Sequence, residues 1–125
     1  MGAPKNKKYM AQIAIFNLTD RIKGNTFNAV TFHNFTINEI PIDYNSITEV
    51  DIVFSKGSNT GREQVHFSIG NGISLNVAEK SIVLEKIYEL DWNVDTYYYD
   101  VKLTFSTEKI KTFVKGSVKV IQNIS

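Results

Sequence analysis

The sequence contains no cysteine, and proline, methionine and tryptophan are scarce. Without cysteine the chain forms no disulfide and no thiolate zinc site, and it has no cysteine nucleophile. The same absence is compatible with every redox compartment, so it does not locate the protein.

The chain also lacks a charge excess and a long hydrophobic run. Its net charge of +1 argues against a nucleic-acid-binding protein that depends on a basic surface. No apolar stretch reaches the length of a membrane span. The apolar stretch 9–16 contains Gln12 and has no small-residue cleavage site, and Asn6 stands where a myristoylation signal prefers Ser or Thr. We therefore expect a soluble protein made in the cytoplasm, with no membrane and no nucleic-acid partner.

The residues that are present favour β-strands. Eight phenylalanines, six tyrosines and many Ile, Val and Thr residues suit a pleated surface, whereas the helix formers Ala, Leu and Met are few. At 125 residues the chain has the length of one domain, and no repeat or linker divides it. We expect residues 1–8 to be a flexible basic arm and residues 9–125 to form a single β-sandwich domain.

Alternating apolar and polar residues predict about eight strands. The longest alternating segments, 96–105 and 109–120, predict a terminal hairpin. Gly70-Asn71-Gly72 predicts a second hairpin between 64–69 and 73–75, because Asn-Gly tolerates positive φ. The other predicted strands are 9–16, 26–39 with a β-bulge or a bend near 31–34, 48–54, and 81–85. A helix within 77–90 is the alternative to the last of these. This spacing is typical of an antiparallel sandwich or barrel.

The predicted terminal hairpin has two faces. The residues predicted to fill the core are Tyr97, Tyr99, Val101, Leu103, Phe105, Ile110, Val114, Val118 and Val120. Three large side chains are predicted to point outward among Lys111, Lys115 and Lys119, namely Tyr98, Phe113 and Ile121. Because exposed apolar groups favour protein interfaces, we expect these three to contact other subunits. The lysines of the basic arm, Lys5, Lys7 and Lys8, complete this predicted interface.

No constellation of residues predicts chemistry. The segment 91–95 has the Asp-x-Asn-x-Asp opening of a calcium loop, but Thr96 and Lys102 stand where the loop needs Gly and Glu. We interpret it as a polar loop before a strand. His33 and His66 lack zinc spacing, and the chain has neither a Gly-x-Ser-x-Gly elbow nor a phosphate-binding loop. The sequence predicts no catalytic residue, no cofactor and no metal ligand, and hence no enzyme.

Several short segments, in order along residues 21–125, carry a family likeness. They are 21–27, 37–43 leading into 50–54, 67–75, 97–105, 111–116 and 120–125. Together they resemble small phage and prophage tail proteins, a group that includes the N-terminal domain of the phage baseplate upper protein. Departures from that pattern are Asn25 where Asp is usual, the turn 106–108 without Gly, and Ser125 where Thr is typical.

This resemblance implies an immunoglobulin-like antiparallel β-sandwich of about seven to nine strands. It also implies a non-enzymatic structural protein of the virion, in the tail, the baseplate or a head-attached layer. We accordingly expect a homo-oligomer that binds other virion structural proteins and is made in the cytoplasm of a bacterial host. The alternative is a carbohydrate-binding module on the same scaffold, with Trp92 and Tyr97–Tyr99 as the stacking residues.

Overall fold

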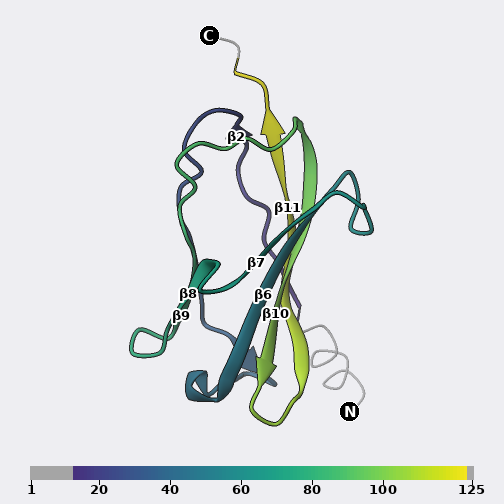
Figure 1. Cartoon of the computed structure of the whole chain (residues 1–125). Coiled ribbons are helices and arrows are strands. Elements are labelled where there is room, and N and C mark those ends of the chain that lie inside the picture. The colour runs from purple at the N-terminus through teal and green to yellow at the C-terminus, as the bar shows by residue number, and fades with distance from the viewer. Residues whose placement is uncertain (1–12, 124–125) are drawn as a thin grey trace.

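The chain folds into an all-β sandwich, which Figure 1 presents as a computed structural model that describes residues 13–123. The strands are β1 (Ala14–Ile15), β2 (Arg21–Ile22), β3 (Val30–His33), β4 (Thr36–Ile37), β5 (Ile40–Pro41), β6 (Ile47–Lys56), β7 (Gln64–Ile69), β8 (Gly72–Asn76), β9 (Ser81–Leu84), β10 (Asp95–Phe105) and β11 (Ile110–Ile121). Within these residues, helical structure is limited to one 3-10 turn, η1 (Tyr44–Ser46). No helix in this part of the chain is long and apolar enough to cross a membrane.

Nine of the strands form two layers that face each other across the core, and β4 and β5 pair with each other in a separate two-stranded sheet. The β10 layer contains β7, β6, β10 and β11 in that order, with β1 and β2 paired along the edge of β11. The β9 layer contains β8, β9 and β3. Side chains of the two layers meet, because the ring centroids of Phe32 and Tyr99 lie 6.4 Å apart and those of Phe27 and Phe54 lie 6.5 Å apart.

The connections follow the order of an immunoglobulin-like sandwich. The chain changes layer between β2 and β3, between β3 and β6, between β7 and β8, and between β9 and β10. Hairpins join β6 to β7, β8 to β9 and β10 to β11. Near the start of β10, the Tyr97 hydroxyl donates to the carbonyl of Asn93 at 2.8 Å, which is the tyrosine corner of such folds. Tyr99, two residues on, contacts Phe32 of β3 where antibody domains place their inter-sheet disulfide.

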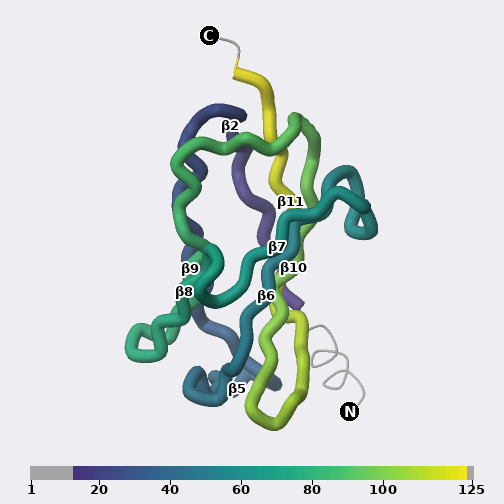
Figure 2. Tube along the Cα trace, viewed as in Figure 1, coloured from purple at the N-terminus to yellow at the C-terminus, as the bar shows by residue number. Residues whose placement is uncertain are grey.

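The sheet is mixed, which corrects the expectation of purely antiparallel strands. Both β1 and β2 pair with β11 in parallel. The predicted hairpin at Gly70–Gly72 is also wrong, since β7 and β8 pair in parallel at two positions only. There the chain leaves one layer for the other, as Figure 2 shows. Gly72 has φ +91°, and a Cβ on it would come within 2.4 Å of the Phe67 ring, so this crossing requires glycine.

A β-bulge in the terminal hairpin changes which residues face the core. The register between β10 and β11 shifts after Val101, so Phe113 has no partner in β10 and both Phe113 and Val114 are buried. Phe113 is 5% exposed, which corrects its predicted outward position, and Ile110 is 68% exposed, which corrects its predicted place in the core. Lys111 lies opposite the buried Leu103 rather than on the outer side. The other predicted core positions are buried, apart from the half-buried Phe105.

The remaining predicted strands agree with the structure where it describes them. Residues 81–84 form β9 rather than a helix. The predicted bend in 26–39 occurs after His33, where Asn34 has φ +65°. Of the predicted first strand, Ala14–Ile15 form β1, and residues 9–12 lie outside the described residues, as does the predicted arm 1–8.

Candidate interaction surface

The side of the β10 layer that faces away from the core is a broad surface, called here the outer face. Strand register places residues on it in rows. One row runs His66, Val53, Asp100, Lys115 and Ile15, and the next runs Gln64, Ser55, Tyr98 and Ser117. Thr104 and Ile110 pair in a further row toward the β10–β11 turn. Long strands produce this surface, because alternate side chains point away from the core. The bulge at Phe113 shifts the alternation in β11 and so brings Ile110 onto it.

The predicted interface residues divide between three places. Tyr98 lies on the outer face and is 38% exposed. Ile121 is half-buried, and alternation along β11 from Ser117 places it on the same face. Phe113 stacks in the core against Phe35, with ring centroids 5.5 Å apart, so it is not part of the outer face. Lys5, Lys7 and Lys8 lie outside the described residues.

Two adjoining hollows surround Tyr98. Their volumes are about 280 and 220 Å³, and both include Asn59 and Lys115 in their lining. Asn59 belongs to the connection between β6 and β7, and it lines the first hollow together with Ser55, which is 4% exposed. The first hollow adds Gln64, Asp100 and Lys102, and the second adds Asn17 and Ser117. Amide, hydroxyl and charged groups thus surround one exposed aromatic ring.

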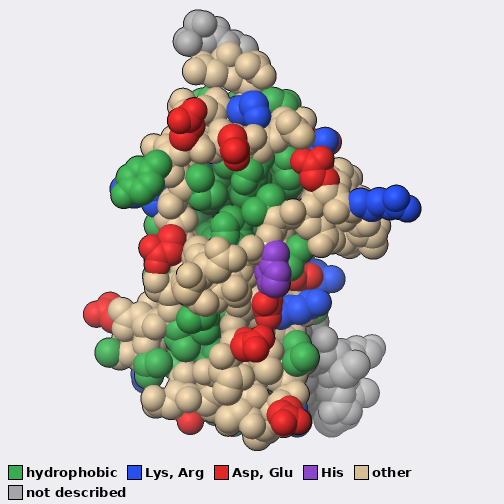
Figure 3. Space-filling view, viewed as in Figure 1, with side chains coloured by type: hydrophobic (Ala, Val, Ile, Leu, Met, Phe, Trp, Pro, Cys, Tyr) green, Lys and Arg blue, Asp and Glu red, His purple; other side chains and the backbone are tan. Residues whose placement is uncertain are grey.

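Charges on the outer face are arranged as opposite pairs. Asp51 lies opposite Lys102, and Asp100 lies opposite Lys115. His66 Nε2 is 2.7 Å from Asp51 Oδ1. In Figure 3, hydrophobic side chains gather in the upper half of the view, with charges of both signs around them. Such a mosaic gives no single-sign field, and it suits a partner surface with its own alternating charges.

Strand β1 is fixed to the edge of the outer face by several hydrogen bonds. The Tyr99 hydroxyl donates to the carbonyl of Phe16 at 2.6 Å, and the amides of Phe16 and Leu18 donate to β11 carbonyls at 2.8 Å each. Burial raises the pKa of Tyr99 well above its ordinary value, because the phenolate would be poorly solvated. Asn17 Oδ1 accepts from the backbone amide and the hydroxyl of Ser117 at 3.0 and 3.2 Å.

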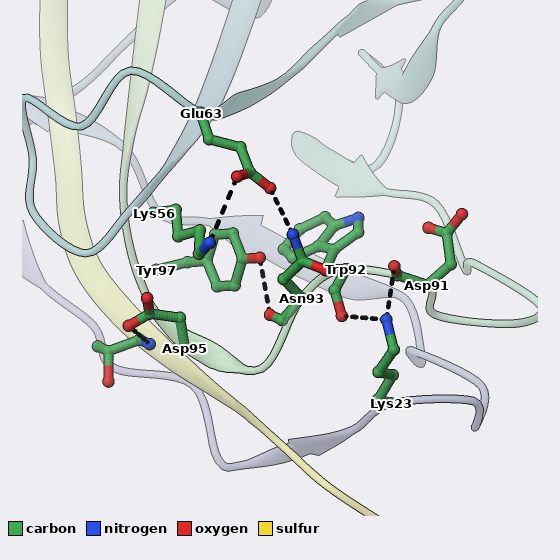
Figure 4. A network of polar contacts seen from close by, with 9 residues as sticks. Lys23, Lys56, Glu63, Asp91, Trp92, Asn93, Asp95 and Tyr97 are labelled. Carbon is green, nitrogen blue, oxygen red and sulfur yellow. Dashed lines mark hydrogen bonds and ion pairs between the residues drawn. The ribbon is translucent and has the colours of Figure 1, made fainter.

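The segment that resembles a calcium loop holds no cation ligand set in the structure. Figure 4 shows that the ammonium of Lys23 donates to the carbonyls of Asp91 and Trp92, at 2.9 Å each. Asp95 Oδ1 accepts from the backbone amide of Thr96, and Asn93 donates to Glu63. Residues 13–123 contain no group of three or more His, Cys, Asp or Glu that could hold a metal. The segment is a polar loop that leads into β10.

The same loop sets the environment of Tyr97. Desolvation by burial is the main cause that raises the pKa of its hydroxyl, and the carboxylates of Glu63 and Asp95 raise the pKa further. Glu63 also lies 3.4 Å from the ammonium of Lys56, so the tyrosine corner is bordered by a small polar network (Figure 4).

The stacking platform proposed for a carbohydrate is absent from the surface. Trp92, Tyr97 and Tyr99 are 9%, 1% and 4% exposed, and all three rings contact other aromatic rings of the core. Of the four residues named for this role, Tyr98 is the one that solvent reaches readily. Sequence reasoning missed Asn17 and Asn59, since both are loop residues whose place over the sheet depends on tertiary structure.

No protein-family model matches the chain, and no curated protein matches it either. The likeness to phage tail proteins therefore stays a prediction from short motifs.

Proposed function

We propose that this protein is a non-enzymatic structural component of a phage virion, and that it joins neighbouring subunits through its outer face. The observation that carries the proposal is that three large apolar side chains from adjacent strands reach solvent on that face, although others such as Ile40 and Tyr88 are exposed elsewhere. Ile15 is 71% exposed, Ile110 is 68% exposed and Tyr98 is 38% exposed. The motif resemblance described above supplies the virion context.

The chemistry of the outer face suits assembly better than catalysis. Apolar and aromatic groups among paired charges are common in protein interfaces, where the apolar groups lose solvent and the charges set the orientation. Each contact is small, but a closed ring of identical subunits repeats it and so gains stability from many copies. Tail, baseplate and head-attached layers are all assemblies of this kind, so the proposal extends to each of them.

Self-association of the purified full chain tests this proposal. We expect light scattering to give a molar mass that rises with concentration toward a multiple of the protomer. Replacing Tyr98 by Ala removes the central aromatic group of the outer face and should weaken association at least about tenfold, since truncating a tyrosine hot spot costs about 2 kcal/mol or more. The matched control is Tyr88→Ala, because Tyr88 is 78% exposed in the connection after β9.

Two results would contradict the proposal. The first is a chain that stays monomeric at every concentration and binds no virion protein. The second is equal weakening by Tyr98→Ala and Tyr88→Ala, since that would remove the outer face from the contact.

A carbohydrate-binding module is the second candidate, now centred on Tyr98 alone. The hollows around this ring offer the amides of Asn17 and Asn59 and the carboxylate of Asp100, groups that hydrogen-bond sugar hydroxyls. Saccharide binding by the monomer that disappears in Tyr98→Ala would favour this candidate. Absence of binding across a glycan array would leave assembly as the function of the face.

A further inference from the structure

Strand β3 has one edge without a partner. It pairs antiparallel with β9 along Val30–His33, and no other strand among residues 13–123 pairs with it. A free strand edge presents backbone N–H and C=O groups that can bind one more strand. On the far side of this edge stands β1, which pairs with β11 instead.

A groove separates β3 from β1 and the adjoining part of β11. Its volume is about 290 Å³, and its apolar lining includes Ala14, Phe16, Phe32, Phe35, Phe113 and Val114. The groove therefore combines the two requirements for strand addition, which are a backbone edge for hydrogen bonds and pockets for alternate side chains. We call it the β3 groove.

The segment just before Ile13 has a matching apolar pattern in the sequence. Tyr9, Ala11 and Ile13 share one phase, so an extended segment here would present apolar side chains on one side. The backbone amide of Lys23 donates to the carbonyl of Ile121 at the end of β11, whereas the ring of Phe35 stacks on Phe113 near its start. The stretch from residue 23 to residue 35, which includes β3, therefore runs opposite to β11. Because β1 is parallel to β11, β1 runs opposite to β3, and Phe16 already lies against Phe32. The axis of β1, extended backward from Ala14, therefore points past the end of β3 rather than along its edge.

We infer that the β3 groove binds residues Tyr9–Gln12 of a second copy of this chain as an added strand. Twelve residues precede Ile13, and at about 3.3 Å per extended residue they reach roughly 40 Å, far enough to enter a neighbouring subunit. The contact is heterologous, because the segment of one subunit enters the groove of the next, and it can close into a ring. This inference rests on the proposed assembly function and names the device that links the subunits.

Three variants and one peptide test the inference. The first variant lacks residues 2–12, and circular dichroism confirms that it folds. The second is Ala14→Phe, which places a ring in the groove, because Ala14 lies opposite the core-facing Val114. The third, Ala78→Phe, is the matched control at an exposed turn between β8 and β9. The peptide is a fluorescent copy of residues 5–13.

We expect the full chain and Ala78→Phe to self-associate, and the truncated chain and Ala14→Phe to be monomeric or at least tenfold weaker in association. The peptide should bind the truncated chain with one-to-one stoichiometry and slow hydrogen exchange in β3. Introducing Ala14→Phe into the truncated chain should abolish that binding.

Two results would overturn the inference. If the full chain is monomeric while the truncated chain binds the peptide, the groove holds the segment of its own chain. If the truncated chain does not bind the peptide, the groove is not a strand site. In the latter case, equal self-association of the full and truncated chains would still support the proposed assembly function. A full chain that never associates would contradict that function as well.

Discussion

Aromatic contacts join the two layers of this sandwich at the position where related folds use a disulfide. Tyr99 contacts Phe32 across the layers and stacks on Phe54 with ring centroids 5.1 Å apart. Such pairs contribute about 0.5–1.5 kcal/mol each beyond the area they bury. A chain without cysteine can therefore hold its layers together in any redox environment.

The tyrosine corner makes stability sensitive to alkaline pH. The pKa of Tyr97 is raised above the ordinary value of 10.0, first by burial and then by Glu63 and Asp95, and burial also raises that of Tyr99. Because the pKa is higher in the folded state than in the unfolded state, the protonated hydroxyl contributes fully to the free energy of unfolding below pH 10, and this contribution is lost as the pH rises above 10. We expect urea midpoints to fall above pH 10 in the native chain and to fall less in Tyr97→Phe.

At neutral pH, Tyr97→Phe should itself lower the free energy of unfolding by about 0.5–1.5 kcal/mol, since it removes one hydrogen bond. Tyr88→Phe, at an exposed site, serves as the control. An identical pH dependence in the native chain and in Tyr97→Phe would show that the corner hydroxyl does not titrate with unfolding.

Burial of Phe113 gives a second prediction at the scale of one residue. Phe113→Ala should lower the free energy of unfolding by about 3–5 kcal/mol, the cost of truncating a buried ring. Tyr98→Ala, on the outer face, should change monomer stability by less than about 0.5 kcal/mol. Chemical denaturation of both variants in dilute solution measures the difference. Similar costs for the two would mean that the bulge does not direct Phe113 inward.

At the scale of elements, Gly116 determines how closely β1 approaches β11. A Cβ on Gly116 would lie 1.9 Å from the carbonyl oxygen of Phe16 and 2.9 Å from the Tyr99 ring. Gly116→Ala should therefore push β1 outward, with a loss of about 1–3 kcal/mol. Hydrogen exchange at the amides of Phe16 and Leu18 should accelerate, whereas the neighbouring exposed variant Lys115→Ala should leave it unchanged. Unaltered exchange in Gly116→Ala would contradict the close packing of this edge.

The elements that could be predicted from sequence are those with uninterrupted alternation. Val50, Ile52 and Phe54 of β6 are buried as their pattern predicts, and so are the odd-numbered residues of β10 from 97 to 103. Here the period of two directly reports which face is buried. The local pattern needs no knowledge of the partner strand.

Elements whose form depends on a partner could not be predicted in this way. One extra residue at Phe113 reverses the phase of the preceding β11 residues, and it is recognisable only from the register with β10. Gly70-Asn71-Gly72 has the composition of a hairpin, but the chain changes layer there because β8 belongs with β9. The hollows around Tyr98 could not be predicted either, because Asn17 and Asn59 reach them from loops that are distant in the sequence.

At the scale of the whole molecule, the sandwich presents two surfaces suited to other subunits. The outer face offers exposed apolar groups among paired charges, and the β3 groove offers a free backbone edge beside apolar pockets. These surfaces belong to different parts of the fold, since the first lies on the β10 layer and the second opens between β3 and β1. A subunit with two distinct surfaces can contact neighbours on both sides at once, as a ring or layer requires.

Thiol protection on assembly tests the central claim most directly, and the absence of native cysteine makes the measurement clean. Ile110→Cys places one thiol on the outer face, and Ala78→Cys places one at an exposed turn away from it. Both variants would be reacted with a maleimide as monomers and in the assembled state. We predict that assembly slows the reaction at position 110 and leaves the reaction at position 78 unchanged. Equal reactivity of position 110 in the two states would contradict the assignment of the outer face to subunit contacts.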